Sequence, residues 1–324
     1  MIESPTVSVI IVSYNTREMT LDCLRTLQSQ LDQPPTEIWL VDNGSTDGSA
    51  DAVAVQFPRV RLIRNAANRG FGAANNQAIR EATGEFVLLL NTDAFPKPGA
   101  VGAMVDLLRR RKDVAVVGPR LLNRDGSLQR SCYRFPSPGR ALCEHSLLTS
   151  AFPNNPITGD YRGWNHDCER NVDFVGGACM IVRRAAIEQV GLFDETFFFY
   201  AEETDWCRRF HHAGWRVAFT PDAEVTHIGG ASGVAQSDRV FEEFHRARER
   251  LIRKHHGTVG LFAFRFFEAI GALLRFLVFG AIRIVSPGRR EKCTHLMGKW
   301  RRILWWTLGR RGAGLRDAVS KSMA

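Results

Sequence analysis

Carboxylates at the ends of apolar segments are the first residues in this sequence with the potential for chemistry. Asp42 follows the apolar run 37–41, and Asn91-Thr92-Asp93 follows the run 85–90. A buried carboxylate is costly unless something pairs with it. Magnesium or manganese, which prefers oxygen ligands and substrate phosphates, would do so at Asp93, and Asp42 suits a hydrogen bond to a base or ribose. At both positions the alternative is a polar cap at a strand end or turn.

A pair of acids after an aromatic run has the character of a general base. Glu202 and Glu203 follow Phe-Phe-Phe-Tyr at 197–200. Adjacent acids repel and apolar neighbours raise a carboxyl pKa, which brings it toward the neutral range where a base is useful. If the segment opens a helix, the two acids could instead simply complement the helix dipole. His227 is a lone imidazole that is either structural or a metal ligand together with Asp93.

The segments that must position these side chains alternate between strand and helix patterns. Apolar, β-branched runs predict strands, and amphipathic runs predict helices. The predicted strands cover 7–12, 37–41, 61–64, 85–90, 172–182 and 216–219, and the predicted helices cover 17–27, 73–81 and 202–213. The stretch 124–170 indicates a loop-rich excursion. This alternation is typical of a doubly wound, mostly parallel sheet, which collects ligands at the carboxyl ends of its strands.

Composition and missing motifs exclude several classes of protein. The 324 residues include 28 Gly and 13 Pro and are 44% hydrophobic, which excludes collagen-like and low-complexity chains. No G-x-x-x-x-G-K-[ST] sequence occurs, and the Gly-rich segment 68–75 follows the third predicted strand rather than the first. P-loop and nicotinamide-dinucleotide chemistry are therefore not expected. Seven Cys without a C-x-x-C pair argue against a disulfide framework or zinc ribbon, and no signal peptide is expected.

Five short motifs occur in a fixed order along the chain. They are V-S-Y-N at 12–15, V-D-N-G-S at 41–45, N-R-G-F at 68–71, N-T-D at 91–93 and E-E-T-D-W-C at 202–207. Over about residues 7–235 this pattern resembles the family-2 inverting glycosyltransferases of the GT-A fold. F-V-G-G-A at 174–178 and F-D-E-T-F-F at 193–198 are similar to the bacterial rhamnosyltransferases of that family. The resemblance implies an α/β fold of GT-A type, Rossmann-like with a mostly parallel central sheet.

The resemblance also implies a role for each matched residue. Residues expected to bind the nucleotide sugar are Ser13, Tyr14, Asn15, Asp42, Asn68, Gly70, Phe71, Asn91, Thr92 and Asp93. Asp93 is the metal-binding acid of the D-x-D position, where Asn91 replaces the first Asp, and His227 is the second ligand of a divalent Mg or Mn ion. The acceptor side is expected to comprise Gly176, Gly177, Ala178 and Trp206. Glu203 matches the catalytic base, with the adjacent Glu202 as the alternative.

The C-terminal region is basic and amphipathic. Residues 246–324 hold 18 Lys and Arg against 4 Asp and Glu, whereas the rest of the chain holds 25 against 30. In the apolar stretch 259–285 the charged residues share one helical sector about 80° wide, and no uncharged run reaches the ~18 residues of a spanning helix. With the Trp- and Arg-rich segment 299–306, this pattern predicts an interfacial helix on an anionic membrane surface.

The C-terminal region also allows other interpretations. It could be a helical subdomain that packs on the catalytic core, or it could form a homodimer interface. Nucleic acid is not an expected partner, because long aliphatic stretches suit lipid better than base stacking.

These observations predict two regions and one reaction. Residues 1–236 are the expected GT-A catalytic domain, and 237–324 the basic helical, membrane-associating region. The expected reaction transfers L-rhamnose from dTDP-rhamnose to a polyprenyl-diphosphate-linked saccharide, such as N-acetylglucosamine, in cell-wall or surface polysaccharide biosynthesis. The expected location is peripheral, on the cytoplasmic face of the cell membrane. The alternatives are another nucleotide-sugar donor, such as a UDP-hexose, and a non-catalytic membrane scaffold on a transferase fold.

Overall fold

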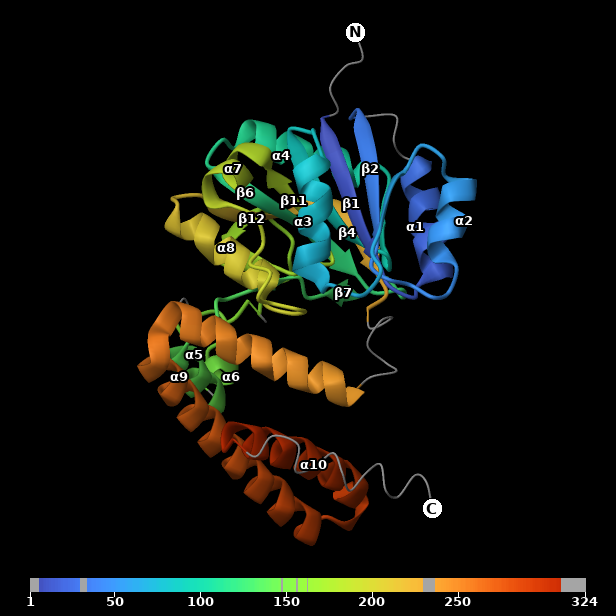
Figure 1. Cartoon of the computed structure of the whole chain (residues 1–324). Helices are drawn as coiled ribbons and strands as arrows, with labels where there is room; N and C mark the ends of the chain where they lie inside the picture. The colour runs from blue at the N-terminus through green and yellow to red at the C-terminus, as the bar shows by residue number, and fades with distance from the viewer. Residues whose placement is uncertain are drawn as a thin grey trace. The chain divides into compact units, whose positions relative to one another are not determined.

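The computed structural model describes residues 6–29, 34–146, 148–155, 157–161, 163–229 and 237–309. The chain divides into two units (Figure 1). The α/β unit comprises Met1–Phe135 and Trp164–Ala247, and the helical unit comprises Pro136–Gly163 and Arg248–Ala324. The boundary expected at 236/237 therefore lies at 247/248. The stretch expected as a loop-rich excursion contributes residues 136–163 to the helical unit, because part of it forms two short helices.

A mixed ten-stranded sheet forms the centre of the α/β unit. Its main path runs β3-β2-β1-β4-β11-β6-β12-β5. The strands of this path are β1 Val7–Ser13, β2 Thr36–Asp42, β3 Arg61–Arg64, β4 Phe86–Asn91, β5 Ala94–Pro96, β6 Val114–Leu122, β11 Cys179–Arg183 and β12 Arg216–His227. Two short strands lie off this path: β7 (Leu128–Gln129) pairs with β6 and β9 (Arg170–Val172) with β12. β8 (Cys132–Tyr133) and β10 (Phe174–Val175) form a separate pair.

Strand direction decides which side chains meet at the sheet edge. β1, β2, β3 and β4 are parallel, as the alternating pattern predicts. Ser13 pairs with Asp42 and Val12 with Asn91, so the carboxyl ends of β1, β2 and β4 are level. β11 is antiparallel to both of its neighbours, which makes the sheet mixed rather than mostly parallel at its centre.

The strand expected over 172–182 is wrong as a single element. The structure divides this stretch into β9, β10 and β11, which pair with different strands. Residues 176–178 leave the sheet between β10 and β11. A continuous apolar run indicates that the segment is buried, but it does not indicate where the backbone stops pairing with the neighbouring strand.

Helices cover both faces of the sheet (Figure 1). Alternate residues of β1, such as Val7, Val9 and Ile11, share one buried core with α1 (Arg17–Gln28), α2 (Ser49–Gln56) and α4 (Ala100–Arg110). The helices α3 (Phe71–Glu81), α7 (Arg184–Val190) and α8 (Glu202–His212) cover the other face. Residues of β1 that alternate with the first set, such as Ile10, are also fully buried. Burial on both faces explains why these strands are continuous apolar runs.

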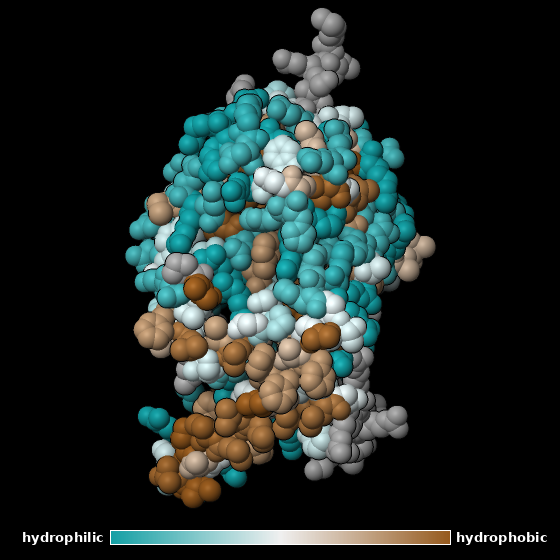
Figure 2. Space-filling model, turned by 90° about the vertical axis from the view of Figure 1, so that its left-hand side faces the viewer, coloured by the Kyte–Doolittle hydropathy of each residue, from teal (hydrophilic) through white to brown (hydrophobic). Residues whose placement is uncertain are grey.

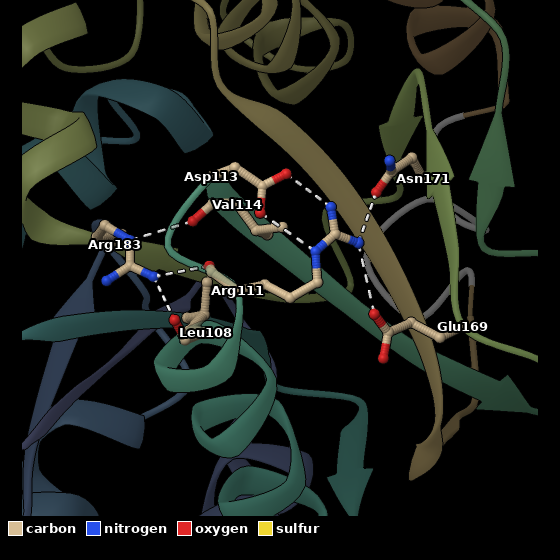
Figure 3. Close-up of polar contacts among 7 residues, drawn as sticks. All are labelled: Leu108, Arg111, Asp113, Val114, Glu169, Asn171 and Arg183. Atoms are coloured by element: carbon tan, nitrogen blue, oxygen red, sulfur yellow. Dashed lines mark hydrogen bonds and ion pairs between the residues drawn. The ribbon is translucent and has the colours of Figure 1, made fainter.

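Two arginines connect the end of α4 to the strands around it (Figure 3). Arg183 is nearly buried and donates to the carbonyl oxygens of Leu108, of Arg111 at 3.2 Å and of Val114 at 3.1 Å. A guanidinium at the C-terminus of a helix satisfies carbonyl groups that have no partner within the helix. Arg183 thus has a structural role, at the end of α4.

Arg111 makes the second set of contacts in Figure 3. Its guanidinium binds both carboxylate oxygens of Asp113, at 3.2 and 2.7 Å, and also donates to Glu169 and Asn171. The hydrogen bonds to Asp113 hold the pKa of that carboxyl below its usual value. The pair fixes the turn before β6 and the chain that enters β9.

The helical unit contains α5 (Pro138–His145), α6 (Leu148–Ala151), most of α9 (Ser237–Val285) and α10 (Arg290–Thr307), with a 3-10 turn at Pro287–Arg289. Gly257 interrupts α9 with φ 67°, a left-handed conformation that glycine adopts without strain. Over the described residues after 236, α9 and α10 confirm the expected helical character. Among the described residues, none of the helices is long and apolar enough to cross a membrane.

Buried ion pairs hold the helices of this unit together. Glu249 of α9 accepts two hydrogen bonds from Arg265, at 2.9 and 2.5 Å, and one from the indole of Trp306 at 2.9 Å. Glu268 lies 3.3 Å from Arg248. Because Arg265 and Trp306 both donate to this one carboxylate, Glu249 ties α10 to both halves of α9.

Candidate active site

A carboxylate and an imidazole meet at the edge of the sheet where β4 ends. Asp93 follows β4 and His227 is the last residue of β12, with Oδ1 of Asp93 3.3 Å from Nε2 of His227. Both side chains are mostly buried, with 10% and 16% exposed. The backbone places them together, because Ala94 pairs with His227 across β5 and β12 and Ile228 N donates to Asp93 O.

Gln129 fixes the orientation of the His227 ring. Its amide nitrogen donates to Asn123 Oδ1 at 2.9 Å and to the His227 carbonyl oxygen at 3.2 Å. The amide oxygen must therefore be the atom that faces His227 Nδ1 at 2.6 Å, and Nδ1–H must donate to it. In the neutral ring this leaves the Nε2 lone pair directed at Asp93. Metal-ligating histidines are held in this way, by a hydrogen bond on the other ring nitrogen.

The donor set at this edge suits a divalent cation that is shared with a substrate. Asp93 supplies a carboxylate oxygen and His227 its Nε2, which are ligand types that manganese and magnesium accept. Among the described residues, no cluster of three or more His, Cys, Asp or Glu side chains could hold a metal ion without other ligands. Two protein ligands leave coordination positions for phosphate oxygens, the usual arrangement for ions that bind with a nucleotide.

The ends of β1 and β2 form a compact polar turn beside this pair. Asp42 is buried, and its carboxylate accepts from Ser45 N and from Ser49 Oγ, both at 3.2 Å. Asn15 has φ 52° and accepts from Thr46 N at 2.8 Å. Ser13 is fully buried, and its hydroxyl pairs with those of Thr16 and Thr20. Its side chain therefore supports the turn from inside the protein.

Asn43 was not singled out in the sequence, yet it organises the neighbouring loop. Its amide nitrogen donates to Asn68 Oδ1 at 3.0 Å, and its amide oxygen accepts from Asn65 and from the backbone of Arg69. Asn68 in turn accepts from Gly70 N. The only available signal was the position of Asn43 within V-D-N-G-S, directly after Asp42.

Gly70 joins this loop to the aromatic segment before α8. It has φ 87°, and a methyl group on its Cα would lie 2.5 Å from the carbonyl oxygen of Phe198. The next residue, Phe71, donates its backbone N–H to the same oxygen at 2.9 Å. Only glycine allows both the left-handed backbone and this close approach. The N-R-G-F loop thus packs directly against the backbone of the segment 193–201 at Phe198.

The two acids at the start of α8 have different surroundings. Glu202 is buried, and its Oε2 has no hydrogen-bond partner within the described residues. Burial and then the neighbouring Glu203 raise the pKa of Glu202 well above its ordinary value. Glu203 is partly exposed, burial raises its pKa as well, and it accepts from the Thr204 hydroxyl at 3.4 Å. Tyr200 and Ala201, with φ 71° and 67°, place strained backbone directly before the pair.

The glycines after β10 lie between Glu203 and the strand that leads to Asp93. A methyl group on Gly177 would stand 3.8 Å from Cγ of Glu203. The next residue, Ala178, accepts a hydrogen bond from Asn91 N at 2.9 Å. Gly176 donates to the Ser131 carbonyl oxygen at 2.8 Å. A short piece of backbone thus runs from the side of Glu203 to the strand end that carries Asp93.

Trp206 corrects one expectation. The residue was placed on the acceptor side, yet its side chain is fully buried and its indole donates to the Gly191 carbonyl oxygen at 2.8 Å. It packs against Phe193 and Phe210. The tryptophan is therefore a core residue that anchors α8, one turn below the exposed end of Glu203. Tyr14, by contrast, is 37% exposed at the end of β1.

The sequence pattern that defines the glycosyl transferase family 2 matches residues 8–191. The chain belongs to this family. Its α/β unit carries the motifs, the sheet and the two acids just described. The match covers the end of β1, the N-R-G-F loop, the Asp93 turn and the glycines at 176 and 177, whereas α8 and His227 lie beyond it.

Several relatives and solved structures are similar to this chain. One is the N-acetylglucosaminyl-diphospho-decaprenol L-rhamnosyltransferase of Mycobacterium tuberculosis, 36% identical over 205 residues that make up 60% of this chain and 66% of the relative. The matched part is thus just under two thirds of that protein. The O-antigen biosynthesis protein RfbC of Myxococcus xanthus is 29% identical over 71% of this chain and 18% of the relative.

Solved structures show the fold class. The mannosyltransferase PcManGT from Pyrobaculum calidifontis, determined with GDP-Man and Mn²⁺, has a TM-score of 0.54 at 20% identity, over 96% of this chain and 89% of that one. GalNAc-T7, determined with UDP, GalNAc and Mn²⁺, has a TM-score of 0.56 at 14% identity, over 78% and 48%. These matches confirm a mixed α/β fold with a central sheet, as in GT-A glycosyltransferases.

Proposed function

We propose that the chain transfers L-rhamnose from dTDP-rhamnose to N-acetylglucosamine linked to a polyprenyl diphosphate, with inversion at the anomeric carbon. The observation that carries the reaction class is the link between Glu203 and the Asp93–His227 pair through Gly177 and Ala178. With a base on one side and a metal-binding edge on the other, the site suits a single displacement at an anomeric carbon that lies between them. The rhamnosyltransferase of M. tuberculosis, at 36% identity, supports the sugar and the acceptor class.

Glu203 is the proposed base. Glu203 is partly exposed and its side-chain methylenes lie beside Gly177, whereas Glu202 is buried. Above its raised pKa, Glu203 accepts the proton of the acceptor hydroxyl as that oxygen attacks the anomeric carbon from the side opposite the diphosphate. The C–O bond to the diphosphate breaks as the new bond forms, so no covalent enzyme intermediate is needed.

The nucleotide side of the reaction falls to the edge formed by β1, β2 and β4. Asp42 and the Asn15 turn hold the nucleoside, and the loop 65–71 closes the site beside it. Magnesium or manganese held by Asp93 and His227 would offset the charge that develops on the departing diphosphate.

Nucleoside diphosphate release is the test of the proposed reaction. The full chain would be incubated with Mn²⁺ or Mg²⁺ and a panel of nucleotide sugars, with and without polyprenyl-diphosphate N-acetylglucosamine. The proposal is supported if dTDP-rhamnose is the one donor of the panel that releases its nucleoside diphosphate, and if it does so only with the acceptor present. Release from a UDP-hexose instead would retain the transferase and discard rhamnose. No release from any donor would favour a non-catalytic scaffold.

We also propose that the helical unit binds an anionic membrane surface, on the cytoplasmic face, where the lipid-linked acceptor would lie. The second part of α9 carries one exposed apolar stripe at helical spacing, formed by Val259, Phe262, Phe266, Ile270, Leu273, Leu277 and Ile284. Figure 2 shows apolar side chains gathered over this unit. Exposed cations flank the stripe, among them Arg253, Arg283, Arg289 and Arg290. Anionic lipid matches this charge, whereas a second copy of the same basic region would repel it.

Replacing Leu277 of the stripe with Asp is expected to weaken binding to phosphatidylglycerol-containing vesicles. A buried leucine contributes about 1.5–3 kcal/mol, so the loss should be at least about tenfold. Sedimentation with vesicles of anionic and of neutral lipid measures it. The control is Val55→Asp, because Val55 is an equally apolar residue, 81% exposed on α2. Unchanged vesicle binding, with a change from dimer to monomer, would assign the stripe to a homodimer instead.

A further inference from the structure

We propose that Arg130, together with Arg120, binds the diphosphate of the lipid-linked acceptor. This inference rests on the proposed function for the identity of the acceptor, and it adds the group that would recognise the acceptor's charge. The diphosphate lies between the sugar that reacts and the lipid, so its binding site must be near the base without being part of the donor site.

The segment 129–133 places Arg130 between the two halves of the candidate site. On one side, Gln129 contacts His227 of the metal pair at 2.6 Å. On the other, the ring of Tyr133 lies beside Gly176, with Cε2 3.7 Å from where a methyl group on that glycine would stand. Ser131 holds the segment in place, because its hydroxyl donates to Pro119 O and its carbonyl oxygen accepts from Gly176 N. Arg130 is therefore held at the edge of the acceptor glycines.

The guanidinium of Arg130 is pre-oriented by its neighbours. It lies over the Tyr133 ring, 4.7 Å from the centroid, and its Nε donates to the Cys132 carbonyl oxygen at 3.3 Å. The Tyr133 hydroxyl donates back to the carbonyl oxygen of Arg130 at 2.8 Å, and its ring stacks on Phe174. A planar guanidinium fixed on an aromatic ring loses little further freedom when it binds a phosphate, and its fork matches phosphate oxygens.

Other cations gather around the same point. Arg120, on β6, lies 3.8 Å from Glu224, and its buried Nε has no hydrogen-bond partner within the described residues. Arg120 lies on the piece of chain next to Arg130, because Leu121 of β6 pairs with Gln129 of β7 and the Ser131 hydroxyl donates to Pro119 O. The carboxylate of Glu224 is shared with Lys97 at 2.6 Å, so it does not offset the cluster fully.

The position of Arg130 favours the acceptor's diphosphate over the donor's. The donor's phosphates belong with Asp93 and His227, which Gln129 contacts. The guanidinium of Arg130 lies instead over the ring of Tyr133, whose Cε2 lies beside Gly176, and Gly176 precedes the glycine beside Glu203. Glu203 also acts on Tyr133, since its charge contributes to the raised pKa of that phenol after burial. An acceptor sugar at Glu203 would thus have its anomeric diphosphate on the Arg130 side.

Binding of geranyl diphosphate tests this inference without any sugar transfer. Isothermal titration calorimetry would use the full chain without divalent metal, so that a metal cannot collect the diphosphate at Asp93. Arg130→Gln is expected to weaken geranyl diphosphate binding by about tenfold or more. The affinity of Arg130→Lys should lie between those of the wild type and Arg130→Gln. The Kd of dTDP measured with Mn²⁺ should stay within about twofold, which also shows that the variant is folded. Arg124→Gln, in an exposed turn of the same region, is the matched control and should change neither value.

The outcomes separate the possible sources of the diphosphate. An equal loss of dTDP binding in Arg130→Gln would move the site to the donor and overturn the inference. No binding of geranyl diphosphate to the wild type, or equal binding to wild type and Arg130→Gln, would also overturn it. In turnover, Arg130→Gln should raise the KM of a diphosphate-linked acceptor and leave that of a neutral alkyl glycoside unchanged. If another nucleotide sugar proves to be the donor, the calorimetric result still decides the role of Arg130.

Discussion

Replacing Glu203 with Gln is expected to lower kcat by about 10²–10⁴-fold, the contribution of a positioned general base. Glutamine has nearly the same shape and keeps the contact with Gly177, but it cannot accept the proton of the acceptor hydroxyl. Binding of dTDP in the presence of Mn²⁺ should be unchanged, because Glu203 lies on the acceptor side. Steady-state rates of dTDP release, together with the Kd of dTDP, measure the two effects separately.

Two further variants make this prediction specific. Glu188→Gln removes an exposed carboxylate from α7, and it should leave kcat within about twofold, as for ordinary surface sites. Glu202→Gln should retain turnover, because Glu202 is buried and an acceptor would not reach its carboxyl. If Glu202→Gln lost activity and Glu203→Gln kept it, the assignment of the base would be reversed. Full activity in both would remove general-base catalysis by these acids from the mechanism.

The same acids predict a dependence on pH. Burial raises both carboxyl pKa values in the folded state, and Glu203 adds to the effect on Glu202. The protonated forms are favoured in the fold, so the stability they contribute is full below the unfolded pKa and is lost as pH rises through the folded values. Glu202→Gln should therefore be more stable than wild type at about pH 8 and should flatten the curve of Tm between about pH 5 and 8. Transfer has the opposite slope, since the base must be deprotonated.

Several strands and helices could be predicted, because their apolar side chains form buried runs or recur with the period of a helix. The strand expected over 61–64 is β3, the one expected over 7–12 is β1 with one more residue at the carboxyl end, and the one expected over 85–90 is β4, which begins and ends one residue later. The helix expected from 73 begins at Phe71 instead, because Gly70 turns the chain there. No assignment had been made for α2, α4 or β6. The antiparallel direction of β11 could not be predicted either, since an apolar run has no direction.

The site shows the same division between local and tertiary information. The strand-end acids could be found because each follows an apolar run, and the parallel register brings those ends level. Gln129 could not be found, because 98 residues separate it from His227 and nothing local distinguishes it. Trp206 was misplaced for a related reason. It lies within a motif rich in polar residues, but the helix turns it toward Phe193 and Phe210 in the core.

Replacing Asp93 with Asn is expected to reduce transfer by at least about 100-fold and to weaken the affinity for Mn²⁺ measured in the presence of dTDP. Asp93 is the carboxylate of the proposed metal site, beside His227, and an amide oxygen binds a divalent cation less strongly. Electron paramagnetic resonance of Mn²⁺ gives the affinity directly. Asp106→Asn removes an exposed carboxylate on α4 and should change neither the affinity nor the rate.

Gln129 extends this prediction to the orientation of His227. Gln129→Met keeps the volume of the side chain but cannot accept from Nδ1, so the ring is no longer held with Nε2 toward Asp93. Loss of such a supporting contact typically costs about 10–100-fold in metal affinity, so Mn²⁺ binding should weaken by that amount. The Kd of dTDP without metal should not change. If Asp93→Asn bound Mn²⁺ as wild type does, Asp93 would not be a ligand, and its contact with His227 would be only structural. If Asp93→Asn weakened Mn²⁺ binding and Gln129→Met did not, the ion would be held without help from Gln129, and the hydrogen bond to Nδ1 would serve only to hold β7 beside the end of β12.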